Sequence, residues 1–133
     1  MNKKLGKILA EISVGELFDK ISILEIKKTK IQDVSKLKDI SKELESLKET
    51  LKKYGLNKID ERLKNLIEKL TNINLDLWDI EDGKRIAEKN KQFDDKFIEL
   101  ARNVYKLNDE RADLKLKINN ILGSNIQEVK SYK

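Results

Sequence analysis

The stretch that decides the fold runs from Leu77 to Asn119 and reads LWDIEDGKRIAEKNKQFDDKFIELARNVYKLNDERADLKLKIN. Its apolar residues recur with alternating steps of four and three, the spacing of a helix face that packs in a bundle or coiled coil. From Phe93 onward this seam consists of Phe93, Phe97, Leu100, Val104, Leu107, Arg111, Leu114, Ile118 and Ile121. Arg111 is its one charged member. Because an unpaired guanidinium in a packed seam loses hydration at a cost, Arg111 needs a structural or functional explanation.

Apolar residues with the same spacing occur in three further segments, so the chain is expected to form four helices separated by short connections. The expected boundaries are a capping box from Ser13 to Glu16, a restart at Asp33 or Ser35, a stop at Gly55, a start at Asn57 and a stop at Gly123. The sequence therefore predicts an all-α fold, an antiparallel four-helix bundle with two long helices. An extended coiled coil that dimerises is the alternative.

We expect residues 1–133 to form a single domain with three parts. Residues 1–12, with apolar residues at helical spacing, form a short N-terminal segment packed on the bundle of residues 13–123. Residues 124–133 form a tail docked on the first helix through Ile126, Val129 and Tyr132. The long third and fourth helices should project beyond the first two by about three turns. Ile80, Phe93 and Phe97 should then form an exposed apolar patch, with Trp78 at its edge.

Composition excludes several classes of function. The chain has neither cysteine nor histidine, so disulfides, zinc sites and imidazole catalysis are excluded, and no cofactor or metal site is predicted. No apolar run reaches membrane-spanning length, and the N-terminus lacks a convincing signal peptide, so no membrane partner and a cytoplasmic location are expected. The 29 cations are interleaved with 24 acids, which does not favour nucleic-acid binding despite the net charge of +5.

Folding the predicted hairpins places several polar residues at one height in the bundle. This polar layer includes Glu25, Lys28, Asn108 and Arg111, together with Ser41 and Asn72 or Asn74. We expect Arg111 to be partly buried and to bond Glu25, with Glu110 as the local competitor. Leu at position 111 should then be nearly neutral or stabilising, because an apolar group avoids desolvating an ion pair, although the Glu25 left unpaired would offset this. A structural ion pair, a guanidinium awaiting a carboxylate or phosphate, and an arginine extended to water are the three interpretations.

A second cluster of candidate binding residues surrounds the single tryptophan. Trp78 and Glu81 are three residues apart and share a helix face, and Arg85 follows Glu81 by four. Asp82 lies between them. A tryptophan at the core edge beside a solvated acidic face is the simpler interpretation, and a partner-binding surface is the functional one.

Several segments resemble a small bacterial all-helical family of unknown function. The resemblance rests on SVGELFDKISILEIK from Ser13, LWDIED from Leu77, FIELA from Phe97, NDERA from Asn108 and VKSY from Val129. Members of that family often accompany genes for sugar transfer and surface polysaccharides, so the resemblance implies a link to that machinery. A weaker likeness is to the all-helical chorismate mutases, which use cations inside a helical bundle to hold a dianionic substrate. This likeness would give the corresponding roles in this chain to Asp19, Lys28 and Arg111. The spacing of that second family is not reproduced.

The sequence thus favours an uncharacterised helical interaction or scaffold domain with a protein partner or self-association, and no catalytic residue is assigned. The alternative is a protein that binds an anionic small molecule, or an enzyme, using Glu25, Lys28, Asn108 and Arg111. If the residues of the polar layer pair with one another, the scaffold is favoured. An open pocket of about 300 Å³ or more with unpaired cations would favour the ligand site.

Overall fold

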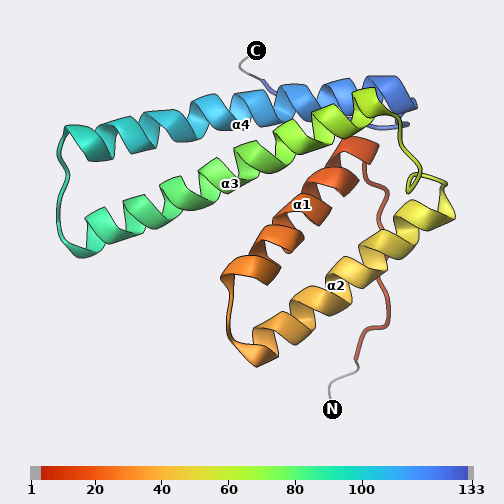
Figure 1. The fold of residues 1–133 in the computed structure, drawn as a ribbon, viewed down its shortest axis with the longest axis horizontal. Helices are drawn as coiled ribbons and strands as arrows, with labels where there is room; N and C mark the ends of the chain where they lie inside the picture. The colour runs from red at the N-terminus through yellow and green to blue at the C-terminus, as the bar shows by residue number, and fades with distance from the viewer. Residues whose placement is uncertain (1–3, 132–133) are drawn as a thin grey trace.

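The computed structural model describes residues 4–131 and contains four helices in this part of the chain (Figure 1). They are α1 (Val14–Lys30), α2 (Val34–Lys53), α3 (Glu61–Lys89) and α4 (Asp95–Leu122). The predicted all-α, four-helix fold is confirmed, and the chain folds back into two antiparallel hairpins, α1–α2 and α3–α4. None of these helices is long and apolar enough to cross a membrane.

Short polar side chains begin the helices and left-handed glycines end two of them. The N-cap residues are Ser13, Asp33, Asp60 and Asp94, and each accepts a hydrogen bond from the backbone N–H three residues later. Gly55 and Gly123, with φ of 70° and 67°, follow α2 and α4 as predicted. The predicted start of α3 at Asn57 is wrong, because the carboxylate of Asp60 takes the capping role and accepts from the N–H of Leu63 at 2.9 Å.

The first helix is the centre of the structure, since α1 packs against α2, α3 and α4. One face of α1 joins α2 in a core cluster formed by Leu17, Ile21, Leu24, Ile40 and Leu44. The other face joins α3 and α4 in a second cluster formed by Phe18, Leu63, Leu70, Ile73, Leu114 and Ile118. The bundle therefore has two adjoining apolar clusters, and α1 contributes to both.

The N-terminal segment does not pack as predicted. Residues 4–12 form no helix, and the side chains of Leu5, Ile8 and Leu9 are exposed to solvent. The amphipathic spacing is present, but nine residues without a capping residue are too few to hold a helix by local interactions alone. Near the end of the segment, Glu11 accepts hydrogen bonds from the side-chain amide of Asn125. Residues 1–3 lie outside the described part.

The α3–α4 hairpin extends well beyond α1 and α2 (Figure 1), as predicted from the helix lengths. The two long helices have 29 and 28 residues, against 17 and 20 for the first pair. Near the distal turn the rings of Phe93 and Phe97 meet edge to face, with centroids 5.3 Å apart. Ile80 is not grouped with these rings as predicted, because it lines a separate groove together with Asn103 and Lys106.

Candidate functional site

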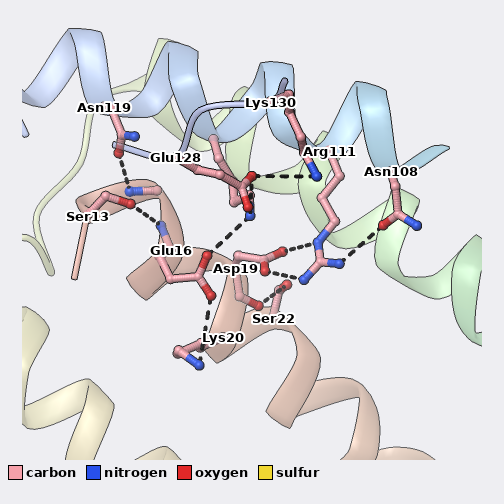
Figure 2. Close-up of polar contacts among 12 residues, drawn as sticks. Ser13, Glu16, Asp19, Lys20, Ser22, Asn108, Arg111, Asn119, Glu128 and Lys130 are labelled. Atoms are coloured by element: carbon pink, nitrogen blue, oxygen red, sulfur yellow. Dashed lines mark hydrogen bonds and ion pairs between the residues drawn. The ribbon is translucent and has the colours of Figure 1, made fainter. Parts of the chain in front are cut away.

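The candidate site is centred on Asp19 of α1, whose side chain is completely buried. Arg111 of α4 donates from Nε to Asp19 Oδ1 at 2.9 Å and from Nη2 to Asp19 Oδ2 at 2.5 Å (Figure 2). Asn74 of α3 donates its amide to Asp19 Oδ1 at 2.9 Å and to the hydroxyl oxygen of Ser22 at 2.8 Å. The Ser22 hydroxyl donates to the backbone carbonyl of Asp19 at 2.8 Å. Three helices therefore meet at one hydrogen-bonded carboxylate.

Arg111 is held in place on two sides. Besides its paired contact with Asp19, its Nη1 donates to the side-chain oxygen of Asn108 at 3.4 Å. The hydrogen bonds to Asp19 raise the pKa of the Arg111 guanidinium above its ordinary value, although burial opposes the shift. A cation whose pKa is higher in the folded state than in the unfolded state stabilises the fold fully at pH values below its unfolded-state pKa. This stabilisation is lost only as the pH rises through its folded-state pKa. Arginine loses its proton only in strongly alkaline solution, so Arg111 stays charged under ordinary conditions.

The N-terminus of α1 is fixed by side chains from three places, which determines where Asp19 lies. The Ser13 hydroxyl oxygen accepts from the N–H of Glu16 at 3.1 Å, and Ser124 Oγ accepts from the N–H of Val14 at 3.1 Å. The Asn119 side-chain oxygen accepts from the N–H of Gly15 at 2.6 Å. Since the first N–H groups of a helix have no partner within it, these contacts satisfy them and attach α1 to the end of α4.

A second group of charges surrounds Lys115, one turn of α4 beyond Arg111. The Lys115 side chain is about 10% exposed, and its Nζ lies 3.2 Å from Glu16 and 3.4 Å from Glu128 of the tail. Glu16 also lies 3.8 Å from Lys20, and Glu128 lies 4.0 Å from Lys130. The two acidic neighbours offset the loss of hydration that burial imposes on this lysine. This group joins α1, α4 and the tail.

The described part of the tail is joined to α1 and α4 by polar contacts. Val129 is 85% exposed and does not form the apolar contact expected of it, whereas Ile126 is 40% exposed. Tyr132 lies outside the described residues. The tail contributes Ser124 and Glu128 to the contacts described above, and Glu128 also lies near Lys130 of the tail itself.

Removing residues 124–133 should lower the melting temperature by a few degrees, because even about 1 kcal/mol shifts a domain of this size by that amount. The truncation removes the Val14–Ser124 hydrogen bond and one of the two acids at Lys115. As a control, Glu128→Gln removes the ion pair with Lys115 and keeps the rest of the tail, so it should lower the melting temperature by less in thermal denaturation. Equal melting of the truncated and full chains, with unchanged amide exchange at residues 17–21, would show that the tail does not hold α1.

The structure brings together five of the eight residues proposed from sequence. An open pocket of about 260 Å³ lies where α1, α3 and α4 meet, and it is lined by Ile23, Asn74, Leu77, Trp78, Glu81, Asp82, Arg85 and Arg111. Asn108 lies beside this group through its bond to Arg111. Glu81 lies 3.5 Å from Lys84. We call this the Trp78 pocket.

The expectation that Glu25 pairs with Arg111 is wrong, and so is the grouping of Lys28 with them. Glu25 lies 3.2 Å from Lys48 of α2, and both side chains are about half exposed. Lys28 is exposed and lines a groove beside α2 together with Ser41 and other residues of that helix. Both residues thus lie on the α2 side of α1. The same placement separates Lys28 from Asp19, so the arrangement suggested by chorismate mutases is not formed.

Asp19 itself was missed as the partner of Arg111, although the sequence carries a signal for it. The apolar seam of α1 accounts for Leu17 and Ile21, which face α2. Gly15, Phe18 and Ser22 form a second buried stripe, and Asp19 lies within it. A helix with two stripes of small or apolar residues is buried on two faces, so a carboxylate in the second stripe has to be paired.

The fold and this site can be compared with those of known proteins. No curated protein and no solved structure is similar enough to match the chain. A family model does match, and it covers residues 8–133 and so includes the four helices, the polar residues around Asp19 and the tail. The chain therefore belongs to the family of unknown function DUF6165.

Proposed function

We propose that the protein is a non-enzymatic interaction or scaffold domain that binds a protein partner through the distal end of the α3–α4 hairpin. The supporting observation is the exposure of large apolar side chains where α1 and α2 do not reach. Ile86 is 60%, Phe93 52% and Ile98 53% exposed. Apolar side chains grouped at one end of a protein are typical of contact surfaces, and an aromatic residue such as Phe93 is a common anchor.

The internal pairing of the polar residues supports an interaction domain over an enzyme built on Arg111. The guanidinium contacts both oxygens of Asp19 and also Asn108, so most of its hydrogen-bonding capacity holds the three helices together. Such a polar contact fixes the register of packed helices, a role that buried polar residues have in coiled coils. The function of this cluster is then to position the α3–α4 hairpin.

The resemblance noted from sequence extends the proposal to a cellular setting. We infer a bacterial, cytoplasmic protein that accompanies glycosyltransferase or surface-polysaccharide machinery, with a protein of that machinery as the partner. Self-association through the same hairpin end is the competing outcome. The rival function from sequence, an anionic-metabolite site formed by Glu25, Lys28, Asn108 and Arg111, loses support because these residues lie on two sides of α1.

Site-specific photo-crosslinking in the native host tests the proposal. A photoreactive phenylalanine analogue at position 93 should give a defined crosslinked product, whereas the same analogue at the exposed Val34 of α2 should not. Adding Ile98→Glu should abolish the product, because a charge next to the contact opposes burial. Identification of this chain itself in the product would indicate self-association, which sedimentation over a concentration series would confirm. A monomer with equal labelling at both positions would refute the proposal.

A further inference from the structure

The Trp78 pocket is lined by arginines whose N–H donors are not all engaged in contacts between the helices. A guanidinium has five N–H donors, and the contacts of Arg111 to Asp19 and Asn108 use three of them. Because Nε and Nη2 are directed at Asp19, the remaining donors belong to Nη1 and Nη2 at the end of the side chain. Arg111 also lines the pocket. Its position is fixed by a buried carboxylate, so these donors are held ready for an acceptor.

Arg85 lies on the same pocket and forms no ion pair within residues 4–131. Together with Arg111 it gives the lining of the pocket two arginines. Glu81 and Asp82 lie on the pocket as well, so its lining carries two positive and two negative side chains, and Glu81 also lies 3.5 Å from Lys84 outside the lining. A simple anion would be attracted by the arginines and repelled by the acids. A ligand with one charge of each sign complements both groups.

The remaining lining is apolar, and the pocket is small. Ile23, Leu77 and Trp78 provide aliphatic and aromatic surface between the charged groups. The volume of about 260 Å³ is below the range of drug-sized sites, which begins at roughly 300 Å³. It suits a molecule of a few heavy atoms beyond its charged groups.

We propose that the Trp78 pocket binds a small zwitterion, a free α-amino acid with an apolar side chain. The carboxylate of the ligand accepts hydrogen bonds from the end of Arg111 and from Arg85. The ammonium group lies toward Glu81 and Asp82, and the side chain packs on Trp78 and Leu77. This inference goes beyond the interaction function proposed above, because it assigns a ligand to a different part of the molecule.

The single tryptophan makes the test specific to the pocket, since Trp78 is the one source of indole signal in the chain. L-Leucine, N-acetyl-L-leucine and L-leucinamide are titrated to about 50 mM while the Trp78 indole N–H resonance and fluorescence are followed. L-Leucine should give a saturable change. Its two derivatives, each lacking one charge, should bind about tenfold or more weakly, the size of a lost hydrogen bond to a charged group.

Variants and a matched control complete the experiment. Arg85→Gln and Asp82→Asn should each weaken L-leucine binding at least about threefold, as expected for an exposed charge contact. Arg62→Gln removes an exposed arginine of α3 that does not line the pocket and should leave binding unchanged. Equal binding of N-acetyl-L-leucine, tighter binding of L-leucinamide, or no saturable change with any compound would overturn the proposal. So would equal effects of Arg85→Gln and Arg62→Gln.

Discussion

Replacing Arg111 with Met is expected to destabilise the fold by about 3 kcal/mol, the lower end of the range for removing one partner of a buried ion pair. The variant leaves the completely buried Asp19 carboxylate with the amide of Asn74 as its remaining side-chain donor. The lower end applies because that donor remains and because Arg111 is itself partly exposed. Urea denaturation followed by circular dichroism measures the change. The nearly neutral or stabilising effect expected from sequence treated the acid left without its cation as a small offset, whereas the acid at this position, Asp19, is completely buried.

A double-variant cycle isolates the pair. In the Arg111→Met background, Asp19→Asn should recover more than about 1 kcal/mol, because a neutral amide at position 19 is less costly to bury unpaired. Glu25→Gln serves as the control and should change stability by less than about 1 kcal/mol, since its contact with Lys48 is exposed. Additive effects of the two substitutions, or an Arg111→Met variant as stable as the parent, would contradict the assignment of Asp19 as the partner.

Gly15→Ala is expected to destabilise the fold by about 2–3 kcal/mol through overpacking against backbone. A Cβ atom at position 15 would lie 2.5 Å from the carbonyl oxygen of Lys115 and 2.9 Å from the Asn119 side-chain oxygen. The helices α1 and α4 would have to separate, which would weaken the Gly15–Asn119 hydrogen bond and the Glu16–Lys115 ion pair. Thermal and urea denaturation should both show the loss.

Gly83→Ala is the matched control, since Gly83 also lies in a helix and packs against a neighbouring one. Its added Cβ would lie 3.3 Å from Leu100 Cδ1, the far end of a flexible side chain that can move aside. Alanine is favoured over glycine within a helix by up to about 1 kcal/mol, so this variant should be as stable as the parent or more so. Gly15→Ala should therefore lower the stability of the fold, and Gly83→Ala should not. Equal effects would show that the close approach of α1 to α4 at Gly15 is not a determinant of stability.

The helices and most of their ends were predictable from sequence because the signals for them are local. The four-and-three spacing of apolar residues depends on helix geometry alone, and a cap at Asp33 or a stop at Gly55 depends on a few neighbouring backbone groups. The start of α3 shows the limit of this reasoning. The pattern of apolar residues begins on the N-terminal side of Asp60, so the pattern alone places the start of the helix too early. The capping side chain of Asp60 decides where the helix begins.

The candidate site was only partly predictable. The anomaly at Arg111 was visible in one seam, and the cluster of Trp78, Glu81, Asp82 and Arg85 follows from spacing on one helix. The acid that pairs with Arg111 could not be chosen in this way. Counting residues from a turn gives the height of a side chain along a helix, but not the direction in which its helix is rotated relative to the others.

The sequence by itself therefore determined the all-α class, the number and approximate length of the helices, and the need for a partner at Arg111. Tertiary structure alone decided that α1 lies between α2 and the α3–α4 hairpin, which buries it on two faces. That placement turns Asp19 toward Arg111 and Asn74 and turns Glu25 toward Lys48. The physical reason is that helix formation depends on neighbours along the chain, whereas the partner of a buried charge depends on which faces of distant helices meet.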